Sequence, residues 1–251
     1  MRRAPAPMRA LAIGLAVLGI LGWTNLAHAD ALQTVLDQAG TADYSPILRT
    51  FLLLSALSLL PILLIGLTSF TRIIVVLSLV RSAIGLQQTP PNSVLITLAL
   101  FLTFFTMAPV VQTIQHDALD PYLAHHIETT EAVQRGFQPL KLFMVRQTHA
   151  ADLKAVLSMA KAPQPRTIND IQAADLIPAF MLSELETAFQ IGFVIFLPFL
   201  LVDLVVAAVL MGLGMIMVPP ATISLPLKIL LFLLINGWTL IAQALLSSYM
   251  S

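Results

Sequence analysis

Two charged residues stand out in the apolar sequence near the C-terminus. Asp203 is the only acid and Lys228 the only base between positions 188 and 250. An isolated charge in hydrocarbon costs at least about 2.5–3.5 kcal/mol, so each needs a partner. The chemistry open to them is an ion pair, a proton relay or, for Asp203, intramembrane aspartyl proteolysis. Proteolysis needs a second carboxylate to share a proton, and the sequence places no other acid in a predicted span.

A helical hairpin would bring these two charges to the same depth. The midpoint between Asp203 and Lys228 falls at Met215 and Ile216. Each charge then lies some eight residues from the nearer end of the tip segment 211–220, or about 12 Å at 1.5 Å per residue. We therefore predict an ion pair within one subunit, with Arg72 or Arg81 of a neighbouring subunit as the alternative partner of Asp203. The two arginines are nine residues apart and point to opposite faces of a helix, so they cannot hold one anion together. Anchoring at the membrane interface or pairing with neighbouring subunits suits them better.

The predicted tip, residues 211–220, has an unusual composition. Two glycines and a Pro-Pro pair interrupt the apolar run, because glycine loosens a helix and proline removes a donor. Met211, Met215 and Met217 stand where a turn normally carries Asn, Asp or Ser. Two interpretations are open: a buried bend filled by methionine, or a deformable apolar constriction.

Other catalytic or metal chemistry finds little support. The histidines lack the H-x-x-x-H and H-E-x-x-H spacings of zinc sites, so a solvated helix face is favoured over a metal site, and no cofactor is expected. No serine lies in a nucleophile elbow, and there is no glycine-rich phosphate loop. The chain has no cysteine, which excludes disulfides and thiolate sites. The residues considered for a metal site are His116, His125, His126 and His149, with Asp117 and Asp120.

The composition is that of a polytopic membrane protein. Hydrophobic residues make up 58% of the 251 residues and charged residues only 10%. The formal net charge is zero, so the basic face that nucleic-acid binding needs is not indicated.

The N-terminus has the pattern of a secretory signal peptide over residues 1–29. Arg2, Arg3 and Arg9 precede a short apolar stretch that ends in Ala27-His28-Ala29. The alternative is an uncleaved first transmembrane helix, but the short core and the A-x-A end favour cleavage before Asp30.

Three further segments follow from the pattern of apolar and charged residues. Residues 30–114 hold two apolar runs, the first long and kinked, separated by the loop Gln87-Gln88-Thr89-Pro90-Pro91-Asn92, whose double proline is expected to end the arriving helix.

Residues 115–187 carry most of the chain's charge and predict a small helical periplasmic domain. Within it, Asp120-Pro121 predicts a helix start, Gly136 a helix stop and residues 162–165 a linker. Residues 188–251 form the C-terminal hairpin. The predicted fold is all-α, with four spans and helical hairpins.

Several long strings resemble the FliP family of the bacterial flagellar export gate. They include Ile177-Pro178-Ala179-Phe180 and Ser183-Glu184-Leu185, and they cover nearly all of the mature chain. The virulence type III secretion homologues share most of these motifs, and the signal peptide favours the flagellar branch. The strings lie at residues 68–81, 85–92, 98–105, 177–180, 183–185, 189–193, 196–200, 203–206 and 214–226.

The resemblance implies an assembly and a role. Such subunits form a pentamer that joins FliQ and FliR around a conduit for unfolded flagellar proteins, in the bacterial inner membrane at the flagellar basal body and together with FlhA and FlhB. It implies that Met211, Met215, Ile216 and Met217 belong to a gasket that closes the conduit, and that Phe143 and Glu184 lie in subunit contacts. Many relatives carry a further Met where this chain has Ile216.

Two other classes compete with a protein-conducting gate. A small-solute transporter more often shows paired broken helices or an inverted repeat, and the two hairpins here share only their Pro-Pro tips. A membrane enzyme needs a convergent polar site, which the sequence does not indicate.

Overall fold

The computed structural model describes residues 50–51, 54–55, 58, 61, 63 and 65–249. The chain divides into two compact units, residues 1–56 and 57–251, and every helix named below belongs to the second. The predicted signal peptide lies outside the described residues. Most of the predicted first crossing, residues 47–86, lies within them, and its last part is the helix Phe70–Ile84. In the described part of the chain the structure is helical and contains no strand, as the sequence predicts.

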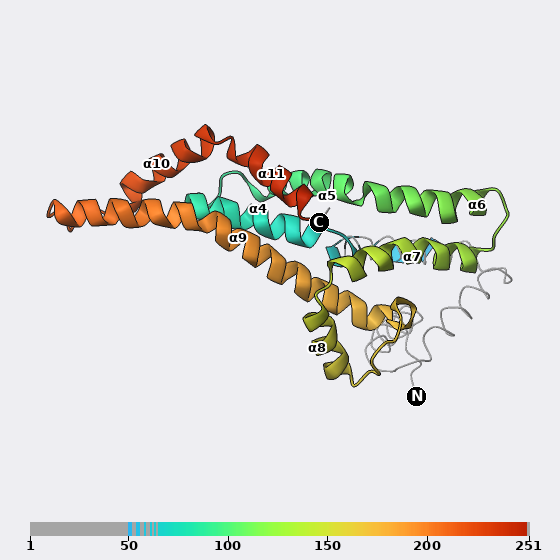
Figure 1. The fold of residues 1–251 in the computed structure, drawn as a ribbon. Helices are drawn as coiled ribbons and strands as arrows, with labels where there is room; N and C mark the ends of the chain where they lie inside the picture. The colour runs from blue at the N-terminus through green and yellow to red at the C-terminus, as the bar shows by residue number, and fades with distance from the viewer. Residues whose placement is uncertain are drawn as a thin grey trace, which may run out of the picture. The chain divides into compact units, whose positions relative to one another are not determined.

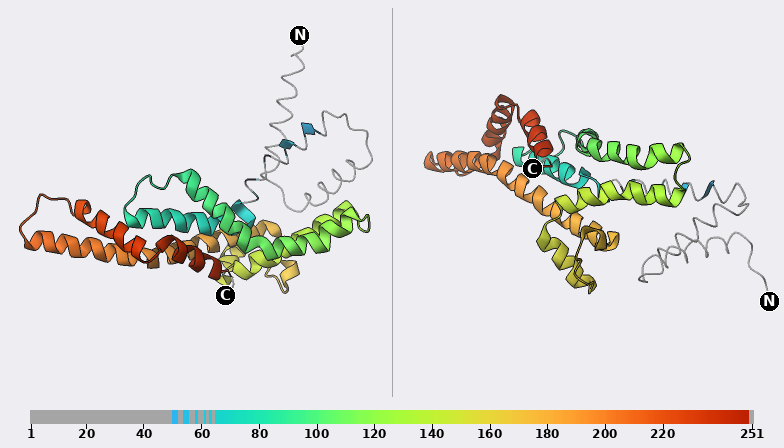
Figure 2. Two further views of the ribbon diagram at one scale, coloured as in Figure 1. Left: turned by 90° about the horizontal axis from the view of Figure 1, so that it is seen from above. Right: turned by 45° about the vertical axis from the view of Figure 1, so that its right-hand side comes forward.

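The helices carry the labels of Figure 1, which begin at α4. The long helix α9 contacts α4, α7, α8 and α10, and α4 also packs against α5 (Figures 1 and 2). The elements are α4 (Phe70–Ile84), α5 (Asn92–Ile114), a π-helical turn η1 (Gln115–Leu119), α6 (Asp120–Leu123), α7 (Thr129–Gln147), α8 (Ala150–Ala160), a 3₁₀ turn η2 (Ile168–Asp170), α9 (Ala173–Gly212), α10 (Ala221–Leu234) and α11 (Gly237–Ser247).

Two helices of the described residues are long and apolar enough to cross a membrane. They are Asn92–Leu123 and Ala173–Gly212. The pair α10 and α11 forms a third candidate, bent by 63° at Ile235 and Asn236, where Asn236 adopts a left-handed conformation. The number of candidate spans in this part agrees with the last three of the four predicted crossings.

Two apolar cores hold the helices together. The larger one joins α4 to α5, α9, α10 and α11, with Ile73, Val76 and Val80 of α4 fully buried. The smaller one gathers Met144, Ile171, Leu176 and Phe180 and joins α7 to the start of α9. The segment 115–187 therefore contains a small core of its own, but its predicted end at residue 187 falls inside the unbroken helix α9.

Of three predicted helix boundaries, two are corrected and one is confirmed. Asp120-Pro121 does not begin a new helix, because η1 carries the chain from α5 into α6 without a break. Gly136 does not end a helix but lies inside α7, where a Cβ atom would be 3.6 Å from Ala118 Cβ. An added Cβ atom would thus make ordinary van der Waals contact with the preceding helical segment. The predicted linker at residues 162–165 does lie between α8 and η2, outside any helix.

The two interhelical turns share one design. α4 ends at Gly85 and α9 ends just before Gly214, and both glycines have positive φ angles, 92° and 75°. The amide that follows each glycine donates to a carbonyl five residues back, Leu86 to Arg81 and Met215 to Leu210, as in a Schellman motif. The Pro-Pro pairs come five residues after each glycine and precede the next helix. They therefore start α5 and α10 rather than end α4 and α9, which corrects the sequence interpretation.

Candidate functional sites

The hairpin of α9 and α10 presents apolar side chains at its tip. Met211 ends the last turn of α9 and is 67% exposed, and Met215 is 43% exposed in the turn. Ile216 is 85% and Met217 97% exposed. Glycines 212 and 214 have no heavy atom within 4 Å of a built Cβ position, so the turn is open on all sides. Of the two interpretations, a buried bend is excluded within this chain, because the side chains contact little of it.

An ion pair joins the two arms of this hairpin below the tip. Lys228 Nζ of α10 lies 2.5 Å from Asp203 Oδ2 of α9. This is the contact within one chain that the equal distances of the two charges from the tip predict. The Lys228 side chain is 8% exposed and that of Asp203 39%. Lys228 also donates to the carbonyl of Ala83 at 3.4 Å, near the end of α4. One lysine therefore ties α10 to two other helices.

A small cavity adjoins this pair. It has a volume of about 410 Å³ and is lined by Asp203 and Lys228 together with Gly85 and Pro220, so that both interhelical turns contribute to it. The exposed part of the Asp203 carboxylate borders this space. The pair is thus desolvated on the lysine side and accessible on the aspartate side.

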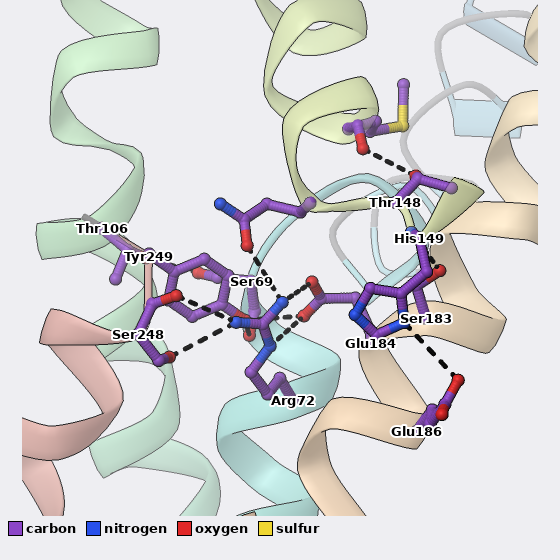
Figure 3. Close-up of polar contacts among 12 residues, drawn as sticks. Ser69, Arg72, Thr106, Thr148, His149, Ser183, Glu184, Glu186, Ser248 and Tyr249 are labelled. Atoms are coloured by element: carbon purple, nitrogen blue, oxygen red, sulfur yellow. Dashed lines mark hydrogen bonds and ion pairs between the residues drawn. The ribbon is translucent and has the colours of Figure 1, made fainter. Parts of the chain in front are cut away.

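A second ion pair lies fully inside the helical bundle. Arg72 of α4 is 2% exposed and Glu184 of α9 is 0% exposed. Arg72 Nη2 is 2.5 Å from Glu184 Oε1, and Arg72 Nε is 3.1 Å from Glu184 Oε2, so the guanidinium holds both carboxylate oxygens (Figure 3). Such a two-point contact is the strongest arrangement that arginine offers a carboxylate.

The rest of the guanidinium is also satisfied. Arg72 Nη2 donates to Gln147 Oε1 of α7 at 3.0 Å, and Nη1 donates to the carbonyl of Ser248 at 3.4 Å (Figure 3). The Tyr249 ring lies under the guanidinium with its centroid 4.0 Å from Cζ, a cation–π contact. The charge buried at Arg72 therefore has partners from α7, α9 and the C-terminal segment.

Tyr249 closes the network from the C-terminal end. Its hydroxyl lies 2.6 Å from Glu184 Oε2 and 3.2 Å from the Ser69 carbonyl. Burial, and then the nearby Glu184 carboxylate, raise the pKa of the Tyr249 phenol above its ordinary value, so it stays a donor. The Ser69 hydroxyl in turn hydrogen-bonds that of Thr106 on α5. We call Ser69, Arg72, Thr106, Gln147, Glu184, Ser248 and Tyr249 the polar knot.

The polar knot corrects the interpretation of one predicted residue. Arg72 does not anchor at an interface or await another subunit, because its own chain supplies a buried carboxylate. The Glu184 side chain is enclosed by its own chain, and its expected part in a subunit contact stays a prediction. Phe143 is half-buried and stacks on Tyr249 with centroids 6.1 Å apart, and it lines a groove of about 740 Å³ between α5 and α7. Its role in subunit contacts stays a prediction.

Arg81 holds the first turn in place. Its Nη1 donates to the Pro90 carbonyl at 3.1 Å and to Asn92 Oδ1 at 2.7 Å. Arg72 and Arg81 thus bind different groups, in agreement with the expectation that they cannot share one anion. Within the described chain Arg81 fixes the loop that carries Gln87, Gln88, Pro90 and Pro91 rather than serving a charge elsewhere.

The sequence missed most of the polar knot. Gln147 and the pair Ser248-Tyr249 are far in the chain from Arg72 and from each other, and nothing in their local spacing links them to it. The available signal was the need of Arg72 for a carboxylate, but nine acids in residues 115–187 left the choice open.

Comparison with known proteins decides the family. The sequence model of the FliP family matches residues 53–245, more than half of the chain. The chain belongs to the FliP family. Members of the FliP family named "Flagellar biosynthetic protein FliP" include that of Pectobacterium carotovorum subsp. carotovorum, 46% identical over 96% of this chain and 92% of its own length. That of Bacillus subtilis (strain 168) is 47% identical over 86% of this chain and 97% of its own length. That of Aquifex aeolicus (strain VF5) is 48% identical over 84% and 90%.

Proposed function

We propose that this protein is a core subunit of the flagellar type III export gate. Several copies, five by resemblance, would form with FliQ and FliR a conduit for unfolded flagellar proteins, beside FlhA and FlhB in the inner membrane. Membership of the FliP family supports a part in flagellar biosynthesis. The names of the relatives also favour the flagellar branch over a virulence secretion system.

The observation that carries the gate proposal is the exposed apolar tip. Ile216 and Met217 project from the end of a two-helix arm that supplies them with almost no contacts. Apolar side chains at such a site need a cover, and tips of neighbouring copies would provide it. A ring of these tips would exclude water and ions by dewetting, while flexible methionine rotamers would let an extended chain pass.

Large apolar surfaces elsewhere are consistent with an assembled subunit. Phe101, Phe104 and Phe105 of α5 and Phe189 and Phe193 of α9 are each about 60% exposed. Lipid or neighbouring subunits would cover these faces. The charged segment 115–187 would then lie on the periplasmic side.

Ion leakage tests the gasket. Replacing Met211, Met215 and Met217 together with Ala should make the assembled gate conduct small ions, because alanine leaves gaps in the ring. Met159→Ala is the matched control, since Met159 is 70% exposed on α8, away from the tip. An assembled triple variant that stays ion-tight would defeat the gasket idea.

Assembly size tests the broader proposal. In mild detergent the wild-type protein should run as a ring of five with small membrane partners. A small oligomer that purifies alone would favour a solute transporter instead.

A further inference from the structure

Three potential metal ligands lie close together where the start of α8 packs against α9. His149 immediately precedes α8, Asp152 lies in its first turn, and Glu186 lies on α9. His149 Nδ1 is 3.5 Å from Asp152 Oδ2 and 3.5 Å from Glu186 Oε2, and Figure 3 shows the imidazole directed toward Glu186. One ligand atom from each residue lies within 4.8 Å of the other two.

These distances suit a small divalent cation. Zn²⁺ binds imidazole nitrogen and carboxylate oxygen at about 2.0–2.2 Å, and a tetrahedral angle then separates the ligand atoms by about 3.3–3.5 Å. Both separations from His149 Nδ1 match this spacing. A cation could therefore lie among the three atoms after a small rotation of the side chains, with water in the fourth position.

A buried hydroxyl group fixes two of the ligands. Ser183 is fully buried on α9, and its Oγ lies 2.5 Å from Asp152 Oδ2, to which it donates. The same oxygen accepts the backbone N–H of His149 at 2.9 Å. Ser183 thus holds the start of α8, with His149 and Asp152, against the helix that carries Glu186. Hydrogen bonds behind the ligands act in the same way in metal sites.

The charges around the site also point to a cation. Within the described residues, Asp152 and Glu186 make no ion pair with Lys or Arg, and both carboxylates converge on one imidazole. Gln190 donates to Glu186 Oε1 at 3.2 Å, which leaves Oε2 facing His149. Two carboxylates facing a single imidazole carry more negative charge than that one side chain could balance, and a divalent ion would balance it.

We propose that His149, Asp152 and Glu186 bind a divalent transition-metal ion, with Zn²⁺ the best match to one imidazole and two carboxylates. The local spacing of the histidines in the sequence does not predict this site. Here the ligands come from two stretches that only the packing of α8 on α9 brings together. The site is far from the apolar tip in sequence and does not depend on the gate function.

Calorimetric titration with Zn²⁺ tests the site on the full-length protein, purified in detergent without a polyhistidine tag. We expect one Zn²⁺ per chain, with affinity reduced about tenfold or more by each of His149→Gln, Asp152→Asn and Glu186→Gln. His116→Gln is the matched control, since His116 also contacts a carboxylate, Asp117, at 2.7 Å but lies outside the site. It should bind like the wild type, and all variants should keep the wild-type size in gel filtration.

Either of two calorimetric results would overturn the site: Zn²⁺ uptake by the wild type no greater than that of a protein carrying His149→Gln, Asp152→Asn and Glu186→Gln together, or an equal loss in His116→Gln. Co²⁺ absorption on the wild-type protein gives a second readout that needs no variant. Intense visible bands of a low-coordinate ion are expected, and they should fade as the pH falls because the ligands must be deprotonated. The weak spectrum of free Co²⁺ would also refute the proposal.

Discussion

The two ends of α9 are built in opposite ways. Around Glu184 the helix is enclosed, and the buried carboxylate accepts hydrogen bonds from Arg72 and Tyr249 of the same chain. At the other end Met217 is 97% exposed and apolar. Side chains at the first end have their partners within the chain, whereas those at the second have few contacts within it. The comparison separates residues that stabilise the single chain from residues that contribute little to its own packing.

The largest expected effect is the loss of Arg72. Arg72→Ala would leave Glu184 buried without its counter-ion, so unfolding should become easier by about 3–5 kcal/mol. Denaturant titration in detergent micelles, followed by circular dichroism, measures this. Arg135→Ala is the control. Arg135 pairs with Glu131, four residues earlier on the same helix, and both side chains are half-exposed, so losing this pair should lower the free energy of unfolding by only about 0.3–0.5 kcal/mol. Equal losses in the two variants would show that the knot does not hold the bundle.

Breaking the pair in the hairpin should cost less. Asp203→Asn removes the negative charge that pairs with Lys228 but keeps a hydrogen-bond acceptor, and the side chain is partly exposed. The free energy of unfolding should therefore fall by about 1–3 kcal/mol. The exchange Asp203→Lys with Lys228→Asp should recover part of the loss and of assembly. If the exchanged protein assembles no better than either single variant, the pairing within one chain does not operate.

Gly237→Ala tests the bend between α10 and α11. A Cβ atom there would lie 2.1 Å from Cε2 of the Phe232 ring, which is buried in the larger core. The ring must move, and we expect a loss of about 1–3 kcal/mol. Gly136→Ala is the comparison, with ordinary contacts inside a helix and an expected gain of about 0.5–1 kcal/mol. A neutral Gly237→Ala would mean that the bend adapts freely.

The smallest effect is expected at the tip. Met217→Ala should change the unfolding free energy of the chain purified alone by less than about 0.5 kcal/mol. The buried Met144 makes the contrast, since Met144→Ala should cost about 2–5 kcal/mol in the smaller core. A large loss at Met217 in the isolated chain would mean that the tip stabilises its own subunit, and the two ends of α9 would then not differ as described.

The sequence by itself determined the class of protein and the hairpin. Hydropathy placed Asn92–Ile114 as a span, and the positions of two lone charges about a glycine-rich turn predicted the contact between Asp203 and Lys228. These features are local or follow from simple helix geometry, since one helical rise fixes where two residues meet across a turn.

Only the tertiary structure decided which distant groups meet. The partner of Arg72 is 112 positions away in the chain, and Tyr249 joins them from the C-terminal segment. The position of Gly136 also depended on the tertiary structure, since a glycine inside a helix and a glycine that ends one look alike in the sequence. The periodicity of a sequence shows which face of a helix is apolar. Which of several acids becomes the partner of Arg72 depends instead on how the helices pack against one another. For this reason the polar knot and the site at His149, Asp152 and Glu186 emerge only once α4, α8 and α9 are packed together.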